Sequence, residues 1–243
     1  MIAAAALAAL AALCVVVAWR LTSARWTWRA PRTAILLWQS LGVTWGLACV
    51  GALLSYALEP YGQGALYGLR EFFASVISMG VLHQPRELSR LIALAAGLTL
   101  LGVLIAVLVV AGVQTLRARH RHRVLLSLVA REAPDIPGVR VVDHPGATAY
   151  CVPGLRSQVV VSEGALRLLS RDELAAVLAH EDAHVRERHD LVLLPFAALR
   201  KALPWVPLVR DAQASVELLV EMAADDRARQ RCSPRRLATA LLR

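Results

Sequence analysis

The chain has 243 residues, of which 57% are hydrophobic and only 19% are charged, and its mean hydropathy is +0.53. This composition excludes a disordered chain and is too apolar for a soluble domain alone. Only four cysteines are present, which excludes a small disulfide scaffold. The net charge of +9 comes almost entirely from arginine, but no nucleic-acid-binding motif accompanies it. We therefore expect the chain to contact a lipid bilayer and no nucleic acid.

Three segments without a charged side chain, residues 2–19, 33–58 and 91–116, match the roughly 20 apolar residues that cross a bilayer. They predict three transmembrane helices within a membrane domain of residues 1–116. The first segment resembles a signal peptide in length, but its arginines follow the apolar run instead of preceding it. We therefore expect it to be retained as an anchor.

The arginines also predict the orientation in the membrane. Loop 20–32 has four arginines and no acidic residue, and segment 117–123 (RARHRHR) has four more, whereas the charges of loop 59–90 cancel. Because basic loops remain in the cytoplasm, we expect a multi-pass cell-membrane protein with its N-terminus and loop 59–90 outside. Everything after residue 117 is then cytoplasmic. In the outer loop, the short apolar run 72–85 is either an interfacial helix or a packing element.

Residues 117–243 mix charged and apolar side chains in the manner of a folded domain. Pro134, Pro137 and Gly138 are expected to break the helix that leaves the membrane. Short apolar runs bounded by proline and glycine then predict a small sheet with an exposed edge, its strands covering residues 139–143, 147–151 and 158–162.

A helical pattern follows this predicted sheet. The stretch Ser170-Arg171-Asp172-Glu173 is a capping box and predicts a helix that begins near Arg171. Residues 212–231 have helical propensity throughout. Between them, segment 191–209 is apolar but interrupted by three prolines. It is either a lid or membrane-hugging helix over the site, or a buried core helix.

The first of these helices contains the motif His180-Glu181-Asp182-Ala183-His184, which is H-E-x-x-H. Residues four apart share a helical face, so both histidines can bind one tetrahedral ion. Glu181 can then take a proton from a water whose pKa the metal lowers to about 7. The alternative interpretation is a solvent-facing amphipathic helix.

Two patterns for a third ligand can be tested. The metzincin pattern requires glycine where Glu187 stands and would use Asp190 as ligand, so it is disfavoured. On the second helix, Glu217, Glu221 and Asp225 recur every four residues along one face. Their mutual repulsion would be relieved by a cation, although a solvated acidic stripe is the alternative.

The pairing of His180-Glu181-x-x-His184 with Glu221-x-x-x-Asp225 resembles the membrane gluzincin peptidases. These include the HtpX and CAAX-prenyl endopeptidase group and the BlaR/MecR-like antibiotic-sensor group. The stretches ATAYCVPG and VVVSEGALRLLSRDELAAVLAHE are also similar to these families, and three spans before the zinc domain are closest to the BlaR/MecR-like arrangement. The resemblance covers about residues 117–231.

The resemblance implies an α-helical membrane protein followed by a cytoplasmic α+β zincin-like (gluzincin) domain with a small sheet. It implies one Zn²⁺ per chain, with Glu181 as general base, Asp225 orienting a ligand histidine, and the metal bound by His180, His184 and Glu221. Glu217 is the competing third ligand. Because family members commonly continue into a further membrane helix, we expect the 117–243 domain either to be incomplete or to have lost that helix.

These features lead to the hypothesis of a membrane-anchored zinc endopeptidase in regulatory proteolysis, whose protein or peptide substrate could be a cytoplasmic transcriptional repressor. An HtpX-type quality-control protease and a non-catalytic zinc-binding sensor or scaffold are the alternatives. We expect an extended substrate to add to the sheet at residues 158–162. His189 and Arg227 are the candidate oxyanion donors.

Overall fold

The computed structural model describes residues 1–59, 85–132, 139–146, 148–152 and 158–241. The helix predicted at residues 72–85 and most of loop 59–90 lie outside the described residues. The chain forms two compact units, one of Met1–Ala24 and Leu36–Leu108, the other of Arg25–Ile35 and Val109–Arg243.

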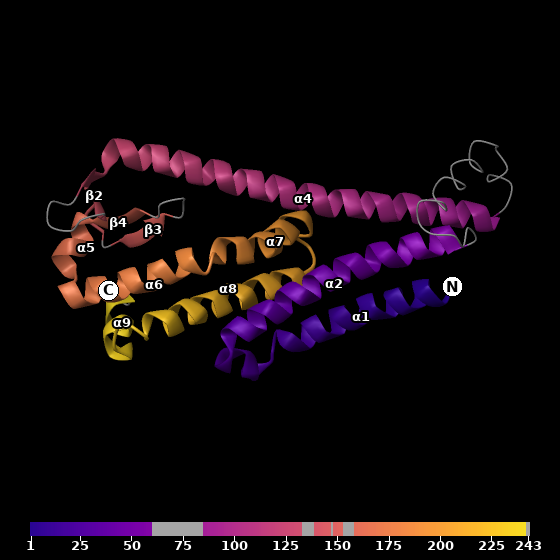
Figure 1. Cartoon of the computed structure of the whole chain (residues 1–243), viewed down its shortest axis with the longest axis horizontal. Coiled ribbons are helices and arrows are strands. Elements are labelled where there is room, and N and C mark those ends of the chain that lie inside the picture. The colour runs from indigo at the N-terminus through magenta and orange to yellow at the C-terminus, as the bar shows by residue number, and fades with distance from the viewer. Residues whose placement is uncertain (60–84, 133–138, 147, 153–157, 242–243) are drawn as a thin grey trace. The chain divides into compact units, whose positions relative to one another are not determined.

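Three long helices confirm the three predicted spans: α1 (Ile2–Leu21), α2 (Pro31–Leu58) and α4 (Pro85–Val129), shown in Figure 1. In the first unit, α2 and α4 pack through the buried small residues Ala57 and Ala93. The Tyr56 hydroxyl lies 2.9 Å from the Ser89 hydroxyl across the same contact. Small residues at such contacts let helix backbones approach closely, which is how helices associate in lipid.

Helix α4 does not end where its apolar run ends. It continues through RARHRHR to Val129, because arginine is a good helix former and no proline or glycine interrupts the run. The helix ends at Val129, before the prolines at 134 and 137. The short 3₁₀ helix η1 (Arg25–Arg29) lies between α1 and α2.

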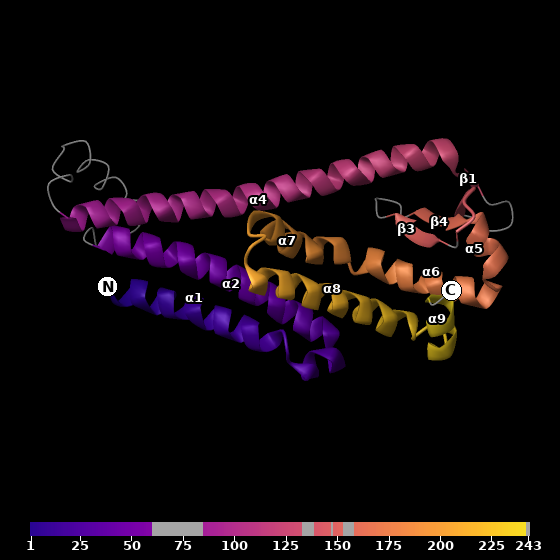
Figure 2. The ribbon, with the colours of Figure 1, turned by 180° about the vertical axis from the view of Figure 1, so that it is seen from behind.

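The second unit contains a four-stranded mixed sheet, visible in Figures 1 and 2. The strand order is β1-β2-β4-β3; β2 and β4 are parallel and the other pairs are antiparallel. The strands are β1 (Arg131–Glu132), β2 (Val139–Val142), β3 (Ala149–Val152) and β4 (Gln158–Ser162). Three of them lie within two residues of the predicted strands, whereas the two-residue β1 was not predicted.

The prediction that residues 158–162 form an exposed edge is wrong. Strand β4 is central and pairs with β2 on one side and β3 on the other. Its Val160 packs with Leu126 of α4 on one face of the sheet, whereas Val161 packs with Leu174 on the other. Because successive side chains of a strand face opposite ways, three consecutive valines fit a strand that is covered on both faces.

Among the described residues, five helices follow the sheet: α5 (Glu163–Leu168), α6 (Arg171–Arg186), α7 (His189–Ala202), α8 (Pro207–Ala228) and α9 (Pro234–Leu241). The predicted capping box is present at the start of α6: the Glu173 amide donates to Ser170 Oγ at 3.3 Å, and the Ser170 amide donates to Glu173 Oε2 at 2.8 Å. Helix α8 begins earlier than predicted, because Pro207 occupies its first turn, where the missing N–H costs nothing.

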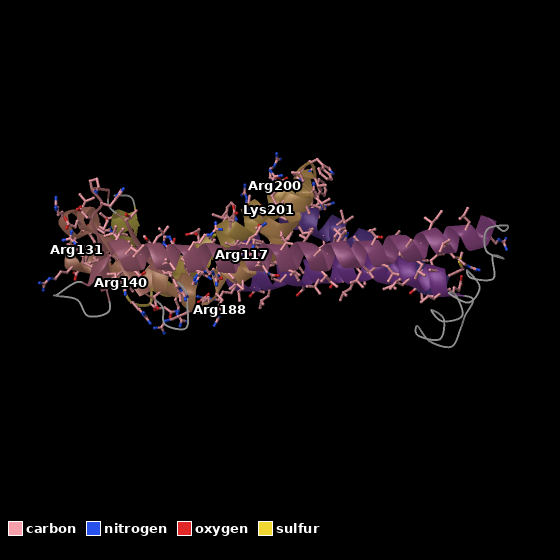
Figure 3. All side chains as sticks on the ribbon, turned by 90° about the horizontal axis from the view of Figure 1, so that it is seen from above. Arg117, Arg131, Arg140, Arg188, Arg200 and Lys201 are labelled. Carbon is pink, nitrogen blue, oxygen red and sulfur yellow. The ribbon has the colours of Figure 1, made fainter. Side chains whose placement is uncertain are left out.

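Segment 191–209 forms most of α7, a break and the first residues of α8. Helix α7 packs against α8, and its Phe196 and Ala198 are buried, as a core helix requires. Arg200 and Lys201 project at its end (Figure 3), where Lys201 Nζ donates to Gln114 of α4 at 3.1 Å. A lid or a membrane-hugging role for this segment stays a prediction.

Candidate metal centre

Small residues bring α6 and α8 together at the site. Buried alanines recur along both helices: Ala176, Ala179 and Ala183 on α6, and Ala223, Ala224 and Ala228 on α8. Because the spacing of packed helices depends on the side chains between them, alanines permit a close approach. A glutamate on one helix can therefore reach histidines on the other.

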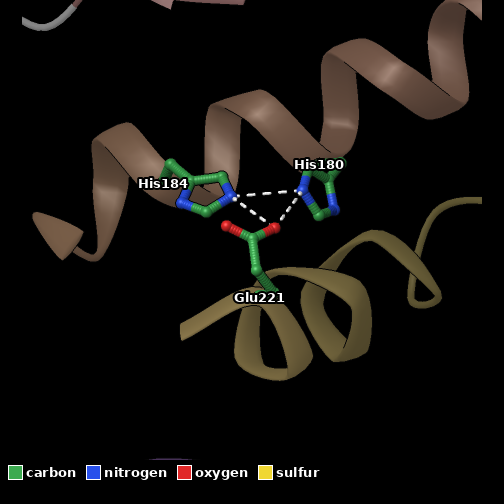
Figure 4. A group of neighbouring side chains, drawn as sticks. All are labelled: His180, His184 and Glu221. Carbon is green, nitrogen blue, oxygen red and sulfur yellow. Dashed lines mark hydrogen bonds and ion pairs between the residues drawn. The ribbon is translucent and has the colours of Figure 1, made fainter. Parts of the chain in front are cut away.

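Three side chains converge in this contact, as Figure 4 shows: His180 and His184 of α6 and Glu221 of α8. The two histidine Nε2 atoms lie 3.1 Å apart. Glu221 Oε2 lies 3.4 Å from Nε2 of His180 and 3.6 Å from Nε2 of His184. His180 is buried, with 5% of its surface exposed, whereas the Glu221 side chain is 60% exposed. The centre thus has a buried side and an open side.

These three distances fit a tetrahedral metal ion. A tetrahedron with metal–ligand distances of about 2.0–2.1 Å, as zinc has with nitrogen and oxygen, has edges of about 3.3–3.4 Å. The observed separations of 3.1, 3.4 and 3.6 Å bracket that length. Two imidazoles and a carboxylate are also a donor set that zinc accepts, and three protein ligands leave the fourth position open.

Asp225 lies behind the first histidine. Its Oδ1 is 3.0 Å from His180 Nδ1, on the opposite edge of the ring from the converging Nε2. A carboxylate at this distance from Nδ1 would favour the tautomer in which Nε2 is free to bind a metal ion. Asp225 is one turn beyond Glu221 on α8, so a single helix supplies both carboxylates.

The other predicted site residues lie outside this cluster. Glu217 is exposed and accepts a hydrogen bond from Gln213 at 2.7 Å, and it is not part of the group of three. Arg227 is six residues after Glu221 and therefore about 120° away around the helix axis. Glu181 follows His180 on α6 and is half-buried. Its role as general base stays a prediction.

His189 lies beside the second histidine instead of facing the open side. Its Nδ1 is 3.0 Å from Nδ1 of His184, on the ring edge that points away from Glu221, and it is 3% exposed. Burial lowers the pKa of His189, and the neighbouring His184 acts in the same direction. This placement favours a role in orienting His184 over the predicted role as oxyanion donor.

A sharp turn between α6 and α7 places His189 beside His184 of α6. Arg188 adopts the left-handed conformation there, with φ 49° and ψ 45°. Among the described residues, Arg188 is the only non-glycine residue with a positive φ. Its side chain is exposed (Figure 3). The left-handed region costs L-residues roughly 1–2 kcal/mol. No sequence signal predicts it here, because glycine is the residue that usually takes this position.

This turn can be tested by substitution at Arg188. Arg188→Gly is expected to leave stability unchanged or raise it by up to about 1 kcal/mol, because glycine removes the steric penalty but loses more chain entropy. Arg188→Val is expected to destabilise by about 1–2 kcal/mol, because β-branched residues tolerate this region least. Thermal unfolding of the detergent-solubilised protein gives the order. A valine variant as stable as the wild type would contradict the strained turn.

Glu187, one residue before this turn, is held by an arginine. Arg32 donates to both of its carboxylate oxygens, from Nε at 3.1 Å and from Nη2 at 2.8 Å. Burial alone would raise the pKa of Glu187, but the hydrogen bonds and charge of Arg32, with His189 nearby, lower it overall. The carboxylate is therefore ionised at neutral pH.

Two histidines four apart on one helix and a glutamate from a second helix form a group that could hold a metal ion, an arrangement typical of metallopeptidases. Residues 115–222 match the sequence profile of Peptidase family M48, which covers the metal cluster. Residues 115–222 thus resemble an M48 metallopeptidase, in a chain with three helices that are long and apolar enough to cross a membrane.

Individual relatives agree with this similarity. The chain is 40% identical to the Protease HtpX homolog of Aeropyrum pernix over 78 residues, which is 29% of this chain and 24% of that protein. It is 36% identical to the Protease HtpX homolog of Pyrococcus furiosus over 88 residues, 35% and 30% of the two chains. With the Protease HtpX of Aeromonas hydrophila subsp. hydrophila it shares 45% over 67 residues, 25% and 23%.

The chain thus spans less than a third of the length of these relatives. No solved structure matches it significantly. The predicted resemblance to membrane gluzincins of the HtpX group is confirmed, as is the fold class of membrane helices followed by a domain with a small mixed sheet. The BlaR/MecR-like subfamily stays a prediction.

Proposed function

We propose that this chain is a membrane-anchored, zinc-dependent endopeptidase whose catalytic domain faces the cytoplasm. The observation that carries the proposal is the convergence of His180, His184 and Glu221 at tetrahedral spacing within residues 115–222, the region that matches Peptidase family M48. When bound, the zinc ion polarises the scissile carbonyl and acidifies a water. The three side chains also leave one position open, which distinguishes a catalytic site from a structural site with four protein ligands.

In this proposal the chain's own residues move the proton. The Glu181 carboxylate accepts a proton from the attacking water and gives it to the leaving amine, so no covalent intermediate forms. Asp225 holds the Nδ1 proton of His180 and so keeps the ring in the ligating tautomer. An oxyanion donor is also needed, and neither His189 nor Arg227 is placed among the three ligands.

We propose strand β3 as the place where an extended substrate docks. Among the described strands, β3 pairs only with β4 and so is at an edge of the sheet. It also packs against α6, the helix that carries both histidines. A peptide that adds to this edge by main-chain hydrogen bonds would lie beside the metal centre. Residues 158–162 do not offer such an edge, because β4 lies between β2 and β3.

Two substrate classes are proposed for the site. One candidate substrate is a cytoplasmic transcriptional repressor that is cleaved in regulatory proteolysis. The similarity to proteins named Protease HtpX supports the HtpX-type alternative instead, in which membrane proteins are the substrates. Comparison of a soluble repressor and an unfolded membrane protein as substrates would separate the two.

The function can be tested on the detergent-purified chain with an unstructured protein as reporter. We expect about one zinc ion per chain by elemental analysis. Cleavage is expected to stop when a chelator removes the metal and to return when zinc is added back. Zinc without cleavage under any condition would favour the scaffold alternative, and a chain that binds no zinc would contradict the proposal.

A further inference from the structure

A row of polar side chains extends the metal centre away from the open side. It begins at His184, whose Nδ1 is 3.0 Å from Nδ1 of His189. Nε2 of His189 lies 3.4 Å from Oε2 of Glu187. Glu187 in turn accepts both hydrogen bonds from Arg32 described above. All four residues belong to the second unit of the chain.

Ligation of a metal by His184 would fix the direction of every hydrogen bond in this row. If Nε2 of His184 binds the ion, its other nitrogen carries the proton and donates it to His189. The remaining ring nitrogen of His189 is then protonated and points at the carboxylate of Glu187. That carboxylate accepts from His189 and from the arginine at once, so each member has one consistent role.

We propose that Arg32 and Glu187 are positioning residues for the metal ligand His184 and act on it through His189. The inference rests on the proposed zinc site. It assigns a role to Arg32, which lies in the first turn of α2. Through this row, the conformation of residues 25–35 determines how firmly the second histidine is held toward the metal.

The geometry at Arg32 requires arginine and is not satisfied by a positive charge alone. Its guanidinium binds both oxygens of Glu187 and also donates to the Ala223 carbonyl on α8 at 3.3 Å. It therefore ties the end of α6 to the helix that carries Glu221. A lysine ammonium can pair with the carboxylate as a point charge but cannot reproduce the fork.

The test measures metal binding instead of cleavage. The full-length protein in detergent is titrated with zinc against a chromophoric chelator, and its cobalt-substituted form is examined by visible absorption, which reports ligand geometry. Arg32→Ala and Glu187→Gln are each expected to weaken zinc binding by roughly 3–10-fold, less than the 10–100-fold typical for direct partners of a ligand. Both are expected to shift the cobalt spectrum, and Arg32→Lys is expected to be intermediate.

The double variant is expected to lose no more than either single variant, because both act through one row. Arg29→Ala is the matched control: it removes an exposed arginine from the same segment and is expected to match the wild type.

If loss of Arg32 impairs membrane insertion, the nearly isosteric Glu187→Gln gives the result alone. Wild-type affinity and spectrum in Glu187→Gln would overturn the role of the row while leaving the zinc site intact. A wild-type chain that binds no zinc would overturn both.

Discussion

Replacing Glu181 with glutamine is expected to lower the rate of peptide cleavage by roughly 10²–10⁴-fold, the usual contribution of a general base. Glutamine keeps the size and the hydrogen-bonding reach of the side chain but cannot accept the proton of the attacking water. Glu181 is not among the three side chains that converge at the metal centre, so zinc binding should be retained. Cleavage of an unstructured reporter and zinc content, measured on the same preparation, give both quantities.

The matched control for this substitution is the next residue on α6. Asp182 pairs with Arg186 at 2.7 Å and with Arg231 at 3.0 Å, so its carboxylate is engaged away from the metal centre. Asp182→Asn removes one negative charge from the same helical turn and is expected to keep cleavage within a few-fold of the wild type. If the asparagine variant lost as much activity as the glutamine variant, the effect would reflect local charge and not proton transfer at Glu181.

Local features of the sequence predicted local features of the structure. The capping box placed the start of α6 correctly because its two hydrogen bonds join residues three apart. The two histidines share a face by helical periodicity alone. The third ligand needed the acidic repeat on a second helix, and there Glu221 and Glu217 were alternatives. The structure brings only the first of these two to the histidines.

Pairing between distant segments was not predictable in the same way. The consecutive valines of β4 are typical of a strand that is covered on both faces, whereas the predicted substrate docking at residues 158–162 requires an edge strand. Nothing in the sequence pairs Arg32 with Glu187, which are 155 residues apart. The arginines of loop 20–32 satisfy the positive-inside rule whether or not one of them also binds a carboxylate. Tertiary contacts of this kind can be identified only when the fold is known.

Replacing Glu221 with alanine is expected to weaken zinc binding by more than the 10–100-fold that loss of an outer partner costs, because a direct ligand is removed. Glu217→Ala is the control on the same helix face, one turn earlier, and is expected to bind zinc like the wild type. Both variants remove one exposed carboxylate from α8, and alanine favours the helix in each case. They therefore differ chiefly in their distance from the two histidines.

Chelator competition on the two purified variants measures the difference directly. If zinc is held by the three converging side chains, Glu221→Ala alone loses affinity, and cleavage falls with zinc occupancy. The opposite order would make Glu217 the third ligand and would require the start of α8 to move toward α6. Equal losses in both variants would mean that the acidic face attracts the cation by its summed charge, and such an effect would be suppressed by high salt, whereas a direct ligand bond would not.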